Sequence, residues 1–169
     1  MRLVKLLGFG LLVFSVASFA QIIVKDPDWV EIDAPPPPAF STTRLIALVM
    51  PPYVSMKFGV DPATLSITPD GVVRYVVVAT SPSGASTAMY EGIRCSAGEF
   101  KTYARLGAND QWVIAKDAEW RELTANNTSK HTLALARQGA CDGRATTASS
   151  AAIIVERLTS GLPAGKNRP

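Results

Sequence analysis

The stretch Val72-Val73-Arg74-Tyr75-Val76-Val77-Val78-Ala79-Thr80, followed by Ser81-Pro82-Ser83-Gly84, decides the fold. Valine and tyrosine favour extended strands, whereas serine, proline and glycine favour the turns that end them. A second extended run covers residues 85–96, and a third covers residues 99–106 after a turn at Ala97-Gly98. Consecutive strands joined by such short turns predict an antiparallel β-meander.

Shorter apolar runs on both sides of this meander extend the predicted sheet. Proline, aspartate and glycine separate these runs, which is typical of turns between strands. We expect four additional strands, over residues 44–50, 56–60, 65–68 and 111–115.

The last third of the chain changes to a helical pattern. Ser129 is the expected N-cap of a helix that ends near Gln138, before Gly139. Ser149 or Ser150 caps a second helix, which ends near residue 161. Strands followed by helices predict an α+β domain, in which two C-terminal helices pack on one face of an antiparallel meander sheet.

The first 20 residues have the build of a secretory signal peptide. Arg2 and Lys5 precede an apolar run over residues 6–16, and Ser18-Phe19-Ala20 places small residues at the cleavage positions. We therefore expect export and a mature chain that starts at Gln21. The alternative is an uncleaved inner-membrane anchor, although Gln21 interrupts the apolar stretch.

Beyond the signal, the sequence predicts a proline-rich tether over residues 21–42, one domain over residues 43–160, and a flexible tail over residues 161–169. Pro35 to Pro38 favour a stiff, extended backbone. Three interpretations of this segment stay open: a spacer, a strap packed on the domain, or a ligand for a proline-recognising partner. Trp29 and Phe40 flank the prolines and are candidates for contact with the domain.

Charge does not favour a nucleic-acid partner. Cleavage removes two of the 17 basic residues and none of the 14 acidic ones, so the formal charge falls from +3 to +1. Such a weak balance lacks the electrostatic signature of nucleic-acid binding.

Two cysteines, Cys95 and Cys141, are the only ones in the chain. An even number in an exported protein favours one disulfide, and the alternative is two buried free thiols. The positions are 46 residues apart (141 − 95), and closing a loop of this length is worth about 4 kcal/mol in the chain-entropy model.

Turn lengths give a predicted register for the meander. A four-residue turn over residues 81–84 places Thr80 opposite Ala85, and it also pairs Arg74 with Glu91. Because side chains alternate along a strand, this register separates two faces. The expected core face comprises Val72, Val76, Val78, Met89, Ile93 and Leu106.

The opposite face of the predicted sheet is the candidate binding surface. Its side chains are tyrosines interleaved with cations, which suits a small anionic, aromatic or glycan-like ligand. The alternative is an ordinary solvated face whose tyrosines pack beneath long basic side chains. The six candidate residues are Tyr75, Tyr90, Arg94, Lys101, Tyr103 and Arg105.

The search for catalytic residues returns little. His131 is the only histidine, so every Ser–His–Asp triad would have to use it, and no G-x-S-x-G motif is present. Zinc-binding motifs such as C-x-x-C and H-E-x-x-H are also missing. We expect no catalytic residues, metal or cofactor, and a hydrolase that uses carboxylates such as Glu91 or Glu99 is the alternative.

Several motifs in order resemble the CNP1-like family of exported proteins from Gram-negative bacteria. The resemblance runs from about Trp29 to Leu158 and includes residues 58–62, 70–76, 90–95, 101–104 and 136–143. It implies a periplasmic domain without an established activity, and it supplies no catalytic residues. The family places cysteines in the Tyr-Glu-Gly-Ile-Arg-Cys and Cys-Asp-Gly contexts, as here, which fits a paired bridge.

These observations favour a non-enzymatic envelope domain that binds a partner protein or a small anionic or aromatic ligand. The first alternative is a small periplasmic hydrolase. The second is a structural envelope factor that uses its proline-rich segment to reach a partner.

Overall fold

The computed structural model describes residues 26–143 and 150–161. The predicted signal peptide, the candidate cap Ser149 and the tail after Gly161 lie outside the described residues.

An antiparallel sheet of eight strands forms the body of the protein, with strand order β1-β2-β4-β5-β6-β7. β3 pairs with the first half of β4, whereas β2 pairs with its second half. β8 pairs with the start of β6. The long strands β4, β5 and β6 are consecutive in both sequence and space. The strands are β1 (Ile46–Ala47), β2 (Lys57–Val60), β3 (Ser66–Ile67), β4 (Val72–Thr80), β5 (Ser86–Arg94), β6 (Glu99–Leu106), β7 (Trp112–Ile114) and β8 (Arg121–Glu122).

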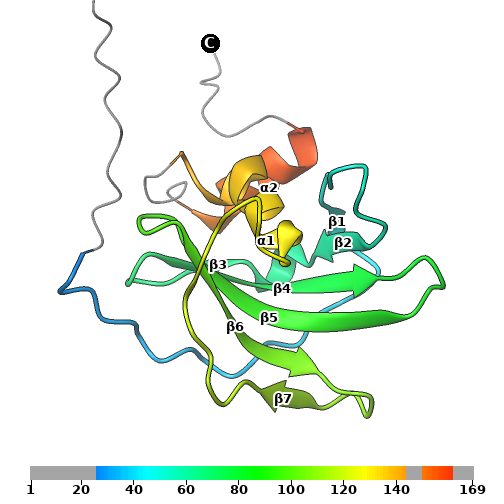
Figure 1. The fold of residues 1–169 in the computed structure, drawn as a ribbon, viewed down its shortest axis with the longest axis horizontal. Coiled ribbons are helices and arrows are strands. Elements are labelled where there is room, and N and C mark those ends of the chain that lie inside the picture. The colour runs from blue at the N-terminus through cyan, green and yellow to red at the C-terminus, as the bar shows by residue number, and fades with distance from the viewer. Residues whose placement is uncertain (1–25, 144–149, 162–169) are drawn as a thin grey trace, which may run out of the picture.

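Two helices follow the sheet. α1 (Lys130–Leu135) continues into a π-helical segment (Ala136–Ala140), and α2 (Ala151–Ser160) comes next. The hydroxyl of Ser150 accepts a hydrogen bond from the Ile153 amide, as expected of an N-cap, whereas Ser129 makes no side-chain cap bond. Leu135 and Ile154 are fully buried and join the core on one face of the sheet (Figure 1).

The predicted register between β4 and β5 is wrong by one residue. Thr80 pairs with Ser86, because Ala85 belongs to the loop, where its carbonyl accepts a hydrogen bond from the Ser81 amide at 2.8 Å. The loop therefore has five residues. As a consequence Arg74 lies opposite Gly92, and the expected Arg74–Glu91 pair does not exist.

The next turn is also longer than predicted. Arg94 pairs with Glu99, so residues 95–98 form the connection, and Lys101 lies opposite Gly92 instead of Arg94. The register then shifts at Tyr90/Glu91, where β6 carries an extra residue, as in a β-bulge.

This register produces two buried faces. The helix face, which packs under α1 and α2, includes Val73, Tyr75, Val77, Met89, Ile93 and Phe100. The opposite face includes Val76, Val78, Ala88, Tyr90, Tyr103 and Ala104. The predicted core set is thus divided, since Met89 and Ile93 lie on the first face while Val76 and Val78 lie on the second.

One disulfide joins Cys95, directly after β5, to Cys141, directly after the π-helical segment. The Cα atoms are 5.5 Å apart. The predicted bridge is confirmed, and it links the sheet to the segment that follows α1.

The second face is covered by the proline-rich segment, residues 29–40, which we call the strap. Ala34 and Phe40 pack on the second core cluster, and Phe40 contacts the ring of Trp112 edge-on. The strap crosses the sheet on the side away from the helices (Figure 1). We therefore call this side of the sheet the strap face. Of the interpretations that the sequence leaves open, the packed strap describes this segment.

Candidate binding site under the strap

The centre of the strap face is built around Tyr103. An ideal Cβ at Gly92 would lie 2.7 Å from the Tyr103 hydroxyl and 2.9 Å from Val72 Cγ1. The missing side chain at Gly92 therefore leaves room for the tyrosine ring. Tyr90 lies beside it, with ring centroids 5.3 Å apart.

Glu31 of the strap places its carboxylate among hydrogen-bond donors of the sheet. Its Oε1 accepts from the Tyr103 hydroxyl at 2.8 Å. Its Oε2 accepts from Lys101 Nζ at 2.8 Å and from the indole of Trp120 at 3.0 Å. We call these three donors the carboxylate site. Arg74 Nη2 lies 3.8 Å from Oε1 and adds a second positive charge.

A second set of contacts holds the neighbouring backbone of the strap. Arg74 Nη2 donates to the Ile32 carbonyl at 2.8 Å and pairs with Asp70 at 3.2 Å. Asp70 accepts from the Ile32 amide at 3.0 Å, and its carbonyl accepts from the Trp29 indole at 2.8 Å. The strap is therefore held by side chains and not by a strand ladder.

Aromatic rings complete the contact at the start of the strap. The Arg94 guanidinium lies over the Trp29 ring, 3.9 Å from its centroid. Trp29 also meets Trp120 edge-on at 5.6 Å. Such cation–π and edge-to-face contacts stabilise a segment that has few backbone bonds of its own.

The environment of the site favours an ionised Glu31 and a protonated, neutral Tyr103. Burial alone raises the pKa of Glu31, but hydrogen bonds from Lys101, Tyr103 and Trp120 outweigh it, so the pKa is lowered. Burial and the bond to Glu31 raise the pKa of Tyr103. The carboxylate is thus an acceptor and the tyrosine a donor at neutral pH.

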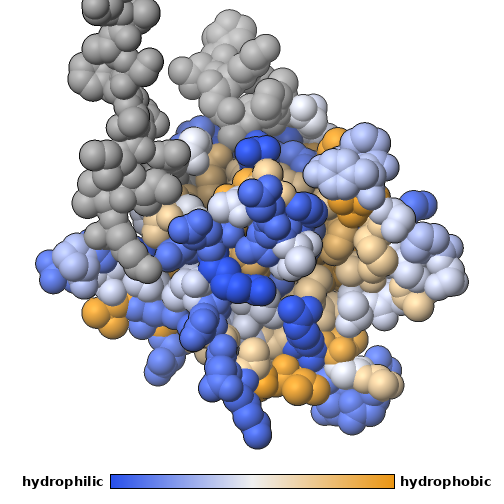
Figure 2. Space-filling model, viewed as in Figure 1, coloured by the Kyte–Doolittle hydropathy of each residue, from blue (hydrophilic) through white to orange (hydrophobic). Residues whose placement is uncertain are grey.

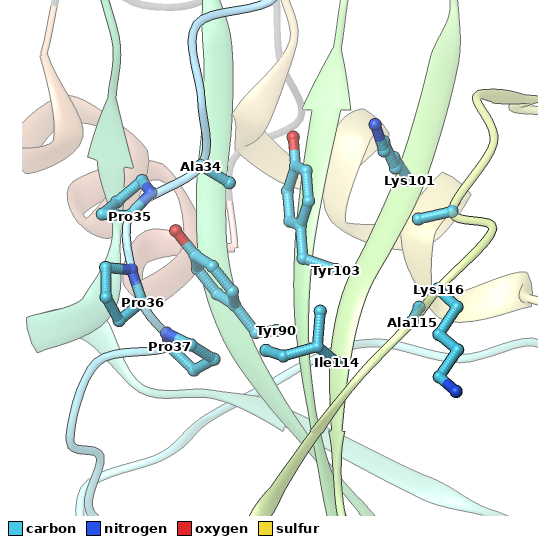
Figure 3. A pocket seen from close by; sticks show the side chains of 11 residues that line it. Ala34, Pro35, Pro36, Pro37, Tyr90, Lys101, Tyr103, Ile114, Ala115 and Lys116 are labelled. Atoms are coloured by element: carbon cyan, nitrogen blue, oxygen red, sulfur yellow. The ribbon is translucent and has the colours of Figure 1, made fainter.

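A pocket of about 430 Å³ lies between the strap and the end of the sheet, and we call it the strap pocket. Figure 3 shows the rings of Tyr90 and Tyr103 between the prolines on one side and Ile114 on the other. The lining residues are Ala34, Pro35, Pro36, Pro37, Tyr90, Lys101, Tyr103, Ile114, Ala115, Lys116 and Ala118. Apolar and aromatic walls with a few polar groups are the usual composition of a small-molecule site.

The pocket opens beside an exposed apolar edge. Val113 and Ile114 of β7 are each 59% exposed. Figure 2 shows apolar side chains at the end of the molecule where β7 lies, next to hydrophilic ones.

The structure brings together four of the six candidate residues from the sequence. Tyr90, Lys101 and Tyr103 line the strap pocket, and Arg94 lies nearby under Trp29. The other two lie elsewhere, since Tyr75 belongs to the helix-face core and Arg105 is exposed, with Nη1 2.9 Å from Met89 Sδ. The expected common face for all six is therefore wrong.

The helix face contains a polar cluster of its own. Glu91 is fully buried and accepts from the Tyr75 hydroxyl at 3.1 Å and from Thr102 at 2.9 Å. His131 Nε2 lies 2.9 Å from the same carboxylate, and its ring stacks on Phe58. Burial alone raises the pKa of Glu91, but the charge and hydrogen bond of His131 and the two hydroxyl bonds lower it overall. The polar groups of this cluster therefore form hydrogen bonds with one another.

Glu31, Asp70 and Trp120 are the site residues that the sequence analysis missed. Glu31 was assigned to a tether, and it is 70 positions from Lys101. The sequence offers no local signal for Glu31, because the predicted register pairs Arg74 with Glu91 and places Arg94 and Lys101 on an open face.

Within residues 26–143 and 150–161, no cluster of three or more His, Cys, Asp or Glu side chains has an arrangement that could hold a metal ion. No helix in the same ranges is long and apolar enough to cross a membrane.

The comparisons with known proteins give one match. The sequence profile of the CNP1-like family matches residues 24–159. No curated protein and no solved structure shows significant similarity to the chain.

Proposed function

The chain belongs to the CNP1-like family, and from this premise we propose that it is an exported, non-enzymatic binding domain of the periplasm. Its ligand is a small molecule that enters the strap pocket. The proposal of export rests on the signal-peptide pattern of residues 1–20, and an oxidising compartment agrees with the Cys95–Cys141 bridge.

One observation carries the binding proposal. The strap pocket combines apolar walls with the polar ends of Tyr90 and Lys101, and its volume suits a small molecule. Tyr90 lines the pocket, and its hydroxyl offers a polar contact for a ligand.

The alternative of a small hydrolase has less support. His131 Nε2 is 2.9 Å from the Glu91 carboxylate, both residues are buried, and Glu91 has no exposed surface. Glu99 lies near Arg94 on the strap face, with 3.9 Å between Oε2 and Nη1. This arrangement favours structural roles for both carboxylates that the sequence analysis considered for catalysis.

The test compares two tryptophan substitutions on β7, one inside the pocket and one outside it. Ile114 lines the pocket, whereas Val113 points to the other side of β7 and has the same 59% exposure. We expect Ile114→Trp to abolish binding of the neutral aromatic probe 2-naphthylmethanol. Changes in the amide chemical shifts of the protein measure this binding. Val113→Trp is the matched control and should bind as the wild type does.

Failure of the wild type to bind the probe, or equal binding by both tryptophan variants, would contradict the pocket as the ligand site. Thermal unfolding of both variants checks that neither substitution has disturbed the fold.

A further inference from the structure

We propose that the ligand of the strap pocket is a small carboxylate with an apolar or aromatic body, and that its carboxylate replaces Glu31 on Lys101 and Tyr103. This inference rests on the proposed function, because it names the ligand class and the internal competitor of the same pocket. Glu31 then acts as a built-in ligand that a carboxylate from solution displaces.

The carboxylate site has the chemistry that a carboxylate requires. Lys101 and Trp120 donate to one oxygen of Glu31, and Tyr103 donates to the other. The donors come from β6 and from the segment before β8, and none of them belongs to the strap, although Trp120 also packs on Trp29. Charge-assisted hydrogen bonds of this kind select a carboxylate over a neutral group of similar shape.

The carboxylate site and the strap pocket are continuous. Lys101 and Tyr103 line the pocket and also bind Glu31. Figure 3 shows the Lys101 amine and the Tyr103 hydroxyl pointing in the same direction, with the Tyr90 ring beside them. A carboxylate on these two groups would therefore place its apolar body against Tyr90, Ile114 and the prolines.

Glu31 is suited to displacement because of how it is held. Its side chain is 20% exposed, and it belongs to a segment without a strand ladder. Its departure would leave Lys101 and Tyr103 as poorly solvated donors, which is unfavourable unless another acceptor arrives. The site thus favours exchange of one carboxylate for another over simple opening.

The test compares two strap variants that lose the same charge. Glu31→Gln weakens the internal competitor, whereas Asp33→Asn neutralises an exposed carboxylate two residues away that makes no contact with the site. The probes are 2-naphthoate and its neutral counterpart 2-naphthylmethanol. Amide and indole chemical shifts of the full chain give both affinities.

We expect Glu31→Gln to bind 2-naphthoate about tenfold more tightly than the wild type does, which is the effect of one charged hydrogen bond. Asp33→Asn should stay within about twofold, and 2-naphthylmethanol should bind all three proteins alike. The Trp120 indole signal should move with 2-naphthoate only. Adding Lys101→Gln to Glu31→Gln should cancel the gain.

Two results would overturn the inference, and they differ in what they say about the proposed function. Equal affinity of wild type and Glu31→Gln for 2-naphthoate, with 2-naphthylmethanol still bound, rejects displacement and leaves the pocket as a binding site. Absence of binding by either probe to any of the proteins rejects both.

Discussion

Each face of the central sheet buries a glutamate among hydrogen-bond donors, but the two glutamates are held in different ways. Glu91 on the helix face comes from the middle of β5, has no exposed surface, and contacts Tyr75, Thr102 and His131. Glu31 on the strap face comes from an extended segment, is 20% exposed, and borders a pocket.

This comparison shows that similar chemistry has different consequences when the supporting backbone differs. A carboxylate in a central strand moves only when the sheet opens, whereas a carboxylate on a strap moves when a few side-chain contacts exchange. We therefore assign a structural role to the Glu91 cluster and a ligand-exchange role to the Glu31 site.

The largest expected effect is a difference in the free energy of unfolding between alanine variants of the two glutamates. Glu91→Ala should lower the free energy of unfolding by about 4 kcal/mol, because it leaves His131 and two hydroxyls buried without an acceptor. Glu31→Ala should cost only about 1 kcal/mol, because Glu31 is already 20% exposed and its donors lose an acceptor at the partly solvated edge of the pocket. Urea denaturation measures both, and equal losses would remove the distinction between the faces.

A smaller effect is expected from Gly92→Ala. The new Cβ would meet the Tyr103 ring and Val72, so these side chains must shift and the hydrogen bond from Tyr103 to Glu31 is disturbed, at a cost of about 2 kcal/mol. Tyr103→Phe removes the atom that the Cβ approaches most closely. In a double-mutant cycle the combined loss should be smaller than the sum of the single losses. Additive losses would show that Tyr103 does not depend on the space at Gly92.

The smallest expected effect is a difference in pH dependence. The pKa values of Glu31, Asp70 and Glu91 are lowered in the folded state. Their contribution to stability is therefore present above the unfolded pKa, about 4.3 for glutamate and about 3.9 for aspartate, and is lost as pH falls through the folded values. Stability should therefore decrease on acidification below about pH 5. Glu31→Gln should show a shallower decrease, and denaturation curves from pH 7 to pH 2.5 test this. An identical slope for both proteins would contradict the lowered pKa of Glu31.

Local patterns in the sequence predicted the three long strands as antiparallel neighbours, but they did not predict the register or β8. The bounds of β4 and β6 agree with the prediction because turn residues flank both strands, Gly71 and Ser81 around β4 and Gly98 and Gly107 around β6. The register failed because Ala85 joins the loop, and a shift of one residue exchanges the two faces. Valines lie on both faces of β4, so the hydrophobic pattern could not correct the error.

The candidate site was predicted in part for the same reason. Tyr90 and Tyr103 share a face because the β5–β6 register over residues 91–94 differs from the predicted one by two residues, which preserves the faces, whereas Tyr75 follows the one-residue shift between β4 and β5 to the helix face. Glu31 was beyond reach of local patterns, since it meets Tyr103 across 72 positions and only the packed strap creates the contact.

Native-state hydrogen exchange of the wild type and Glu31→Gln tests the central claim most directly. The Ile32 amide, bound to Asp70, reports the strap, and the amides of β4 and β5 report the sheet. We expect the strap to open at a lower free energy than the sheet, and Glu31→Gln to accelerate exchange at Ile32 alone. Exchange of strap and sheet at one common free energy, changed equally by the substitution, would contradict the account.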